Sequence, residues 1–289
     1  MTERLISWSR LFEGPLAIGA GRALARAAEL QLPAPILRQI IKAYTVCFDV
    51  DMSVVLAPPD GFGCFAEFFA RRLSPDARPI CGDPFAVVSS CDAAVLDLGQ
   101  INPDSTNRIN IKGFSYNIRD LIGDAGVAEH LGGGGYCLLY LHPRDYHRVH
   151  VPMDGTLREV RYMPGARYPM APWASSFANG ALAKNERVAF DIELEEDGRR
   201  CVVLMIAAFG VGGIESPYLT GPANFGKNRT ALASVVTRGD ELGAFRIGSS
   251  VILLWPKGAV ELDSSTSTGR RVLVGQAIGL LRCTDLKKV

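Results

Sequence analysis

The 289-residue sequence lacks most of the features that commonly reveal a function. Its 31 Lys+Arg and 30 Asp+Glu leave almost no net charge to draw the chain to nucleic acid. The longest apolar stretch, Val202 to Gly213, is too short to cross hydrocarbon. No positive region followed by an unbroken apolar core opens the chain, so we expect no signal peptide. We therefore expect a cytosolic protein that binds no nucleic acid.

Several motifs that carry known chemistry are also missing. The seven cysteines are scattered, odd in number and never at C-x-x-C spacing, which favours buried free thiols over a disulfide framework. No Gly-x-Ser-x-Gly elbow occurs, which argues against a serine hydrolase. The four glycines at 132–135 have no Gly-Lys-Ser/Thr after them and precede a strand pattern. We expect a turn there rather than a phosphate-binding loop.

The first part of the chain is helical in pattern. Apolar residues at helical spacing predict helices within 1–45, interrupted by the Pro33-Ala34-Pro35 run. A further helix is predicted from Phe62 to Leu73. The amphipathic N-terminal region contains arginines, so it fits a membrane interface. Packing of its apolar side on the protein's own core is the alternative.

From about residue 85 the pattern changes to short strands separated by glycine and proline. Alternation from Val188 to Leu194 predicts a half-buried strand. The other candidates are Phe85–Ser89, Ala94–Leu98, Tyr136–Leu141, Cys201–Phe209, Val251–Trp255 and Val272–Leu281. No βαβ alternation is visible. We predict an α+β fold, with N-terminal helices in 1–60 followed by a large, mostly antiparallel β body in 61–289.

Histidine is rare but clustered. Three of the four histidines, His142, His147 and His150, fall within nine residues. Imidazole is the side chain best suited to proton transfer near neutral pH, so the cluster indicates acid–base chemistry. Zinc is the competing interpretation, with Asp145 or Cys137 completing a shell. No familiar ligand spacing supports it, and we expect no metal.

The segment Gly248-Ser249-Ser250 enters an apolar strand, and by itself it predicts only a turn or bulge. Together with other motifs it resembles the phosphatidylserine decarboxylase family from about residue 60 to 280. The motifs that carry the resemblance are Phe65–Arg71, Ala77–Pro79, Lys112–Tyr116, Pro143–Pro152, Asn185–Val188, Gly243–Ile252 and Val274–Gln276.

The resemblance implies a self-cleaving enzyme. The Ser249 hydroxyl would attack the carbonyl of Gly248, splitting the chain into 1–248 and 249–289 and converting Ser249 to a pyruvoyl cofactor. That group would form a Schiff base with the substrate amine and act as an electron sink. By resemblance His150 is the base that activates Ser249, and Asp92 orients it.

The resemblance further implies that His147 protonates the carbon that loses CO2, with Asp145 and Tyr146 as weaker candidates. Two positions depart from the family's pattern. Ala93 follows Asp92 where the family usually has glycine, and alanine tolerates positive φ poorly. Ser250 stands where threonine is usual, which keeps the hydroxyl.

Three functions are compatible with this sequence. The leading prediction is conversion of phosphatidylserine to phosphatidylethanolamine and CO2, with the N-terminal helices contacting the inner face of the membrane from the cytoplasm. The alternative on the same scaffold is decarboxylation of a free amino acid or related small amine. A lipid-binding relative that no longer cleaves is the third. A homodimer is also expected from the resemblance.

Overall fold

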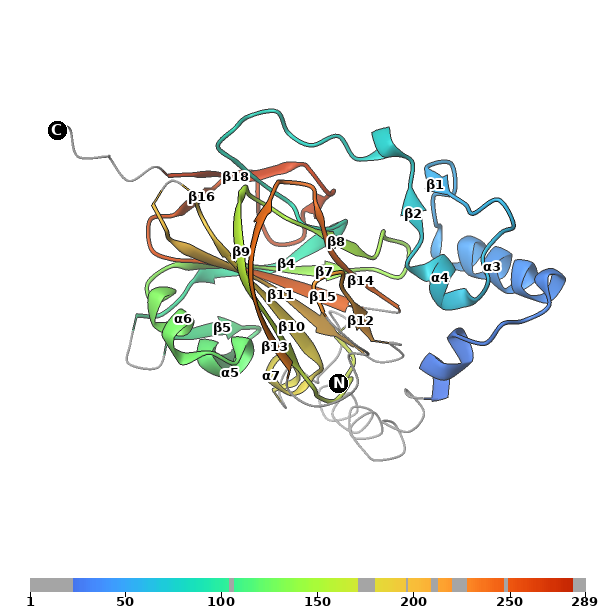
Figure 1. Cartoon of the computed structure of the whole chain (residues 1–289), viewed down its shortest axis with the longest axis horizontal. Helices are drawn as coiled ribbons and strands as arrows, with labels where there is room; N and C mark the ends of the chain where they lie inside the picture. The colour runs from blue at the N-terminus through green and yellow to red at the C-terminus, as the bar shows by residue number, and fades with distance from the viewer. Residues whose placement is uncertain are drawn as a thin grey trace.

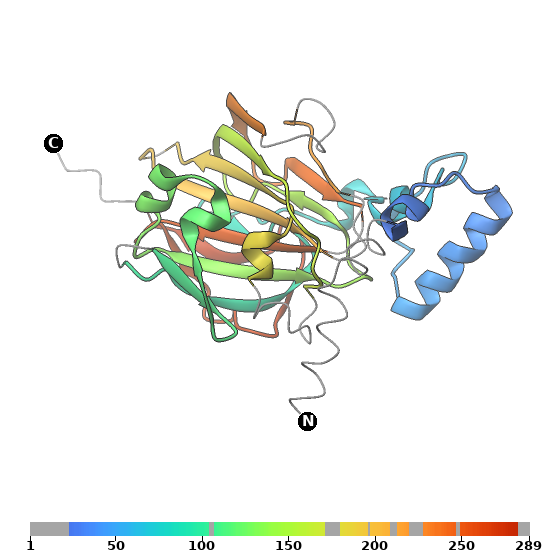
Figure 2. The same cartoon turned by 90° about the horizontal axis from the view of Figure 1, so that it is seen from below.

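The computed structural model describes residues 23–103, 107–170, 180–195, 197–208, 213–219, 228–246 and 249–282, with only the backbone at Asn228 and Ser249. A large β body carries an N-terminal arm on one side, and the long helix of this arm lies away from the sheets (Figures 1 and 2). The predicted α+β class, with a mostly antiparallel β body, is confirmed. The part of the helical prediction that covers residues 1–22 lies outside the described residues.

The central sheet has eight strands in the order β13-β9-β10-β11-β15-β7-β4-β17, and all neighbours are antiparallel. Because this order is far from the chain order, residues distant in sequence become neighbours in the sheet. The strands are β4 (Ala93–Gln100), β7 (Gly135–Leu141), β9 (Gly155–Met163), β10 (Arg187–Glu193), β11 (Arg200–Ala207), β13 (Asn228–Val236), β15 (Ser249–Trp255) and β17 (Arg271–Val272).

The central strands are buried on both faces. Val188, Ala189 and Phe190 are all inaccessible to solvent, so the prediction of a half-buried strand at 188–194 is wrong. The reason is that the sheet is covered on each side. On one face the guanidinium of Arg187 donates to the Leu121 carbonyl of helix α5 (Ile118–Ile122). On the other face a small sheet packs so closely that a Cβ atom on its Gly243 would lie 3.3 Å from the Met205 sulfur.

That small sheet has the order β12-β14-β8, with β8 (Arg148–His150), β12 (Ile214–Glu215) and β14 (Glu241–Phe245). Another sheet, β16-β18-β3, closes one end of the body, with β3 (Ala86–Val88), β16 (Val260–Leu262) and β18 (Ala277–Leu281). The single strand predicted over Val272–Leu281 is wrong, because Gly275 at φ +80° turns the chain between β17 and β18. Strands β5 (Arg108–Ile111) and β6 (Phe114–Asn117) form a separate two-stranded hairpin.

The N-terminal arm contains helix α3 (Ala34–Phe48), which agrees with the helical pattern predicted there, and residues 23–28 are also helical. The helix predicted from Phe62 to Leu73 is shorter than expected. It is α4 (Phe65–Phe69), because the chain then extends into β2 (Arg72–Leu73), which pairs with β1 (Val55–Leu56). Within the described ranges, no helix has the length and apolarity that a membrane crossing requires.

Sequence patterns did not reveal three short helices, α5, α6 (Ala125–His130) and α7 (Ala181–Lys184). Of the six cysteines in the described part, all are free; Cys91, Cys137 and Cys201 are buried, whereas Cys47 is exposed. The prediction of free thiols therefore holds in that part, and the prediction that they are buried holds for only some of them.

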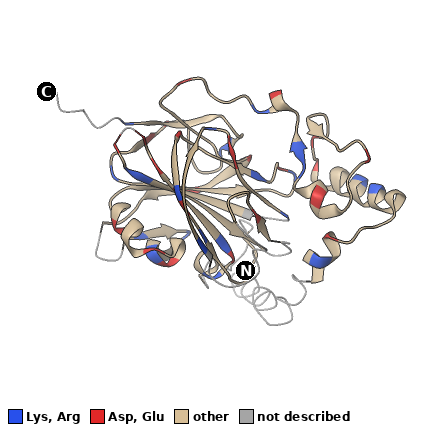
Figure 3. Cartoon of the chain, viewed as in Figure 1, with Lys and Arg blue, Asp and Glu red and all other residues tan. Residues whose placement is uncertain are grey.

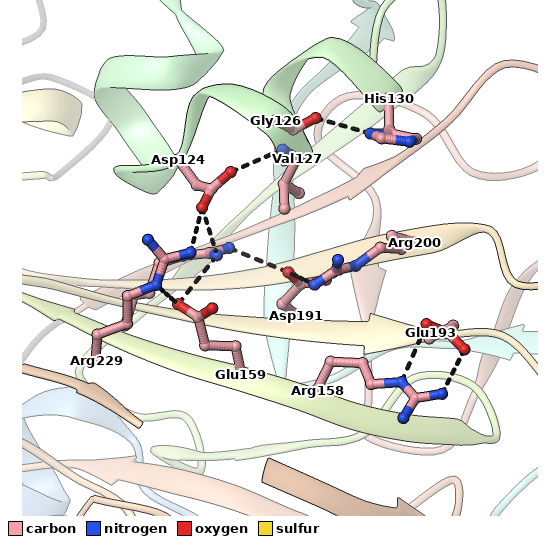
Figure 4. A network of polar contacts seen from close by, with 11 residues as sticks. Asp124, Gly126, Val127, His130, Arg158, Glu159, Asp191, Glu193, Arg200 and Arg229 are labelled. Atoms are coloured by element: carbon pink, nitrogen blue, oxygen red, sulfur yellow. Dashed lines mark hydrogen bonds and ion pairs between the residues drawn. The ribbon is translucent and has the colours of Figure 1, made fainter. Parts of the chain in front are cut away.

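An ion network ties α6 to the sheet (Figure 4). Asp124, whose carboxylate caps α6 through the Val127 amide at 2.8 Å, also pairs with Arg229 and, at 3.3 Å, with Arg161. The buried Arg161 in turn contacts Asp191, which has no exposed side-chain surface. Two buried charges are tolerated because each has a partner of opposite sign.

We expect Asp191→Asn to destabilise the fold by about 3 kcal/mol, because it leaves the buried Arg161 with a weaker set of partners. Glu193→Gln, on the same strand, is the matched control. Its ion pair with Arg158 is exposed, so its loss would cost under about 1 kcal/mol. Urea unfolding of both variants measures the difference. Equal effects would mean that the network contributes no more than a surface pair.

Candidate active site

The predicted cleavage serine begins a central strand beside the histidine segment. Ser249, the first residue of β15, pairs with Leu141, the last residue of β7. The chain continues from Leu141 into a tight turn in which Asp145 accepts the His142 amide at 2.7 Å and donates its own amide to the His142 carbonyl at 2.8 Å. The sheet register therefore brings together two segments more than one hundred residues apart. Gly248 lies outside the described residues.

Two arginines fix this turn from outside. Asp145 is buried, and its carboxylate pairs with Arg271 at 2.6 Å. The buried guanidinium of Arg71 donates to the carbonyls of Arg144 and Asp145, each at 2.9 Å. The Asp145 carboxylate therefore has a structural role, because it is bound by the amide of His142 and by Arg271. These contacts give no support to Asp145 as a proton donor, the role for which it was a weaker candidate.

His147 is completely buried under the N-terminal part of the chain. The ring of Phe69 lies 4.0 Å from the imidazole centroid, and Nε2 is 3.1 Å from the His142 carbonyl. A carbonyl accepts only, so Nε2 carries the proton in this contact. Burial, together with the nearby Arg71 charge, holds the pKa of His147 well below its ordinary 6.5. The side chain is therefore a neutral imidazole at neutral pH.

His150 ends β8 with both ring nitrogens engaged. Nδ1 is 2.7 Å from the Gly239 carbonyl and so donates to it. In the neutral imidazole Nε2 is then the acceptor, and the Tyr146 hydroxyl donates to it at 3.1 Å. Burial lowers the pKa of His150 and raises the pKa of Tyr146 to about 12. The arrangement presents Nε2 as the basic nitrogen.

Asp92 does not hydrogen-bond to His150. Its buried carboxylate accepts from Arg78 Nε at 2.9 and 3.0 Å, from Arg78 Nη2 at 2.5 Å and from the Val274 amide at 2.9 Å. The negative charge still reaches His150, where it opposes the fall of the imidazole pKa. In the uncleaved chain, the Gly239 carbonyl rather than Asp92 selects the tautomer of His150.

The departure at Ala93 is accommodated without strain. Ala93 is the first residue of β4, and it does not have the positive φ that would favour glycine. Ser250, the other departure, is fully buried and pairs with Tyr140 on β7. Its hydroxyl oxygen has no hydrogen-bond partner within the described part of the chain. As the next residue of the strand, Ser250 directs its side chain to the face of the sheet opposite that of Ser249.

A cavity of about 120 Å³ adjoins these residues. Its lining residues include Asp92, Tyr146, Arg144 and Arg271. No group of three or more potential metal ligands occurs among the side chains that the structure describes. Both acidic and basic side chains line the cavity.

Three partners of the site were missed from sequence. Arg78 lies in the quoted Ala77-Arg-Pro79 motif, but nothing local indicates that it pairs with Asp92. Tyr146 was considered only as a weak proton donor, although it contacts His150 directly. Arg271 has no motif signal at all. All three depend on tertiary contacts between segments that sequence spacing does not relate.

A central strand thus opens with Ser249 beside the strand that leads into the histidine segment, and the buried Asp92 directly precedes another strand of the same sheet, β4. The comparisons give the family. Residues 65–280 match the sequence profile of the phosphatidylserine decarboxylase family. The chain belongs to that family, a group of carboxy-lyases.

Curated relatives cover nearly the whole chain. It is 34% identical to a phosphatidylserine decarboxylase proenzyme of Anaeromyxobacter sp. (strain K), over 93% of this chain and 98% of that protein. It is 34% identical to the proenzyme of Marinobacter nauticus, over 97% and 99%. It is 37% identical to that of Alkalilimnicola ehrlichii, over 74% and 76%.

The lowered pKa values of two histidines, the buried His147 and the partly buried His150, make stability depend on pH. His147 and His150 have folded-state pKa values below 6.5, so the unfolded chain binds protons that the folded chain does not. Stability is then lost as pH falls from about 6.5 toward those lower values, by about 1.4 kcal/mol per pH unit for each histidine. Urea unfolding of Ser249→Ala between pH 7 and 5.5 measures this slope.

His147→Gln, made in the Ser249→Ala background, should reduce the slope of unfolding free energy against pH by the contribution of one histidine, about 1.4 kcal/mol per pH unit. His130→Gln is the control, because His130 is exposed on α6 and should leave the slope unchanged. A slope that is unchanged by His147→Gln would show that His147 is not the buried neutral imidazole described above.

Proposed function

We propose that the chain is a proenzyme that cleaves itself between Gly248 and Ser249 and then decarboxylates phosphatidylserine to phosphatidylethanolamine. The observation that carries the proposal is the register of Ser249 with Leu141, the residue immediately before the histidine segment. Membership of the phosphatidylserine decarboxylase family, and the proenzyme names of its relatives, support it.

In the cleavage step, Nε2 of His150 accepts the proton of the Ser249 hydroxyl as this oxygen attacks the Gly248 carbonyl. The Gly239 carbonyl supports this role, because it holds the proton of His150 on Nδ1. Tyr146 occupies Nε2 in the uncleaved chain and must give way or relay the proton. Asp92, anchored by Arg78, adds negative charge that stabilises the imidazolium formed in this step.

The residues present fit a pyruvoyl group at position 249. Its neighbour across the sheet on β11 is Ala207, whose small side chain leaves room for the group. This group supplies an electron sink for the decarboxylation. His147 is the candidate for supplying the proton to the carbon that loses CO2. Because its pKa is held well below 6.5, the neutral imidazole must first take up a proton, and it returns to the neutral form when it delivers that proton to the carbon.

Intact-protein mass spectrometry of freshly purified protein tests self-cleavage. We expect two species, residues 1–248 and residues 249–289 with a blocked N-terminus that reacts with hydroxylamine. Ser249→Ala should remain a single 31.2 kDa chain. His150→Gln should slow cleavage by about 100-fold or more, because the serine loses its base.

His147→Gln is the matched variant within the same segment: it should cleave normally and lose decarboxylation. One uncut chain in wild type and Ser249→Ala alike would contradict the whole proposal. Cleavage that persists in His150→Gln would reject the role of His150 as base.

We further propose that α3 brings the protein to the inner face of the membrane from the cytoplasm. Ile36, Ile40 and Val46 are exposed on α3 although they are apolar. Arg38 and Lys42 lie on the same helix and would meet anionic headgroups (Figure 3). On its inner side Tyr44 donates to the Pro143 carbonyl at 2.9 Å, so this helix contacts the histidine segment.

Flotation with phosphatidylserine-containing vesicles tests the role of α3. We expect Ile36→Asp with Ile40→Asp to weaken vesicle binding at least 10-fold, because two apolar contacts are replaced by charges that anionic lipid repels. Val235→Asp is the control, since Val235 is an exposed apolar residue on β13. Self-cleavage should be unchanged in both variants.

Unchanged flotation of the α3 variant would reject membrane contact through this helix. A homodimer through α3 is the competing role for the same surface. It predicts that the double variant dissociates in sedimentation experiments while vesicle binding persists.

A further inference from the structure

Glu186 is a buried carboxylate with only one of its oxygens engaged. Its side chain is 3% exposed, and Oε2 accepts from Arg167 Nε at 2.9 Å and Nη2 at 2.7 Å. Oε1 is buried and has no hydrogen-bond partner within the described part of the chain. An ionised carboxylate can accept about four hydrogen bonds, so an empty buried oxygen requires an explanation.

Glu186 lies in the same cross-sheet row as the predicted cleavage serine. The Ala207 amide donates to the Glu186 carbonyl at 2.9 Å, and Ala207 pairs with Ser249 on the next strand. Adjacent strands are about 4.8 Å apart, so the Cα atoms of Glu186 and Ser249 are about 10 Å apart. Alanine between them leaves room that a glutamate side chain and a small substrate group together would fill.

The chain upstream of the cleavage site also runs past Glu186. A Cβ atom on Gly213 would lie 3.7 Å from Glu186 Oε1 and 3.9 Å from Arg167 Nη2. The Gly213 carbonyl accepts the Arg246 amide at 3.2 Å, and Arg246 is two residues before Gly248. Glu186 therefore lies near Gly213, which hydrogen-bonds the chain before the Gly248–Ser249 bond, and bonds to Ala207, which pairs with the residue after it.

The position of Glu186 is fixed by its neighbour Asn185. The fully buried Asn185 carboxamide donates to the carbonyls of Ala207 and Tyr168, each at 2.9 Å, and accepts the Tyr168 amide at 2.8 Å. Those contacts complete the hydrogen bonding of Asn185, so its role is structural. The segment is rigid, and Glu186 is the residue of the pair that retains an unused polar atom.

We propose that Glu186 is a catalytic carboxylate that binds the substrate's ammonium group and accepts its proton. An ammonium has no free electron pair, so the amine must lose a proton before its nitrogen can attack a carbonyl carbon. Oε1 takes that proton, while Oε2 stays with Arg167. This inference rests on the proposed decarboxylase function and names the group that deals with the amine.

The surroundings suit this role better than a purely structural one. A salt bridge that only stabilised the start of β10 would be expected to engage both oxygens, because a buried acceptor without a partner destabilises the fold. The nearby Tyr162 does not supply a charge: burial, the negative charge of Glu186 and a hydrogen bond between the two side chains raise the pKa of its phenol to about 12. The carboxylate thus faces a neutral phenol, the Arg167 guanidinium and the cleavage strand.

The test uses the full-length self-cleaved protein and the variant Glu186→Gln, which keeps the shape and the contact with Arg167. We expect normal self-cleavage by mass spectrometry and a fall in kcat/KM of at least 100-fold. The remaining rate should rise with pH, because only amine that is already deprotonated would react. Glu186→Asp, which keeps a carboxylate but retracts it, should recover part of the rate. Glu193→Gln, a glutamate of β10 in an exposed ion pair with Arg158, is the control and should behave as wild type.

Binding gives a second readout that does not depend on turnover. After borohydride reduction of the pyruvoyl carbonyl, calorimetry compares glycerophosphoethanolamine with glycerophosphoglycerol, which lacks the ammonium. We expect the wild type to prefer the ammonium ligand at least 10-fold and Glu186→Gln to lose that preference.

Wild-type protein that never cleaves would defeat the proposed function before Glu186 is tested. If wild type cleaves and decarboxylates, two results overturn the role of Glu186 alone. One is a Glu186→Gln variant with unchanged kcat/KM and ligand preference. The other is a variant whose loss of activity matches a loss of thermal stability and of self-cleavage, with an unaltered pH profile.

Discussion

The site depends on the pairing of β15 with β7 on one side and β11 on the other. This pairing places Ser249 opposite Leu141 and Ala207 at the same time. A slip of one residue in either ladder would move Ser249 to the other face of the sheet. The apolar residues of β15 resist such a slip, because Val251 and Ile252 are both fully buried, one on each face. The hydrophobic core therefore fixes the position of the cleavage serine.

Arginine side chains fix the positions of the buried carboxylates around the site. Arg78 holds Asp92, Arg271 holds Asp145 and Arg167 holds Glu186, and all three carboxylates are buried. A buried carboxylate without such a partner would tend to take up a proton. The guanidiniums keep each carboxylate in a defined place, and their planar fork suits this task. The near-zero net charge of the sequence conceals this local pairing.

The sequence predicted the parts of this molecule that are encoded locally. The helical pattern at Ile36 to Tyr44 and the apolar runs of β7, β11 and β15 correspond to observed elements, because hydrophobic periodicity survives folding. The burial of both faces of β10 was not predictable, since it depends on layers contributed by distant segments. The histidine cluster was visible in the sequence because its members lie within nine residues of one another. The contacts of Arg78 and Glu186 could not be predicted, because they form only when the chain folds. The roles of Asp92, His147, His150 and Ser249 remain predictions.

A single site that performs two reactions needs two kinds of group around one position. Cleavage requires a base for a hydroxyl, and His150 is held in the neutral tautomer that exposes Nε2. The later reaction requires a group for an amine, and a neutral imidazole with a lowered pKa serves poorly for binding a cation. A carboxylate serves better, because it attracts the ammonium before accepting its proton. The two requirements are thus met by histidines from the segment after β7 and by Glu186 beside β11, with Ser249 on the strand between β7 and β11. This separation lets each group keep the protonation state that its own reaction needs.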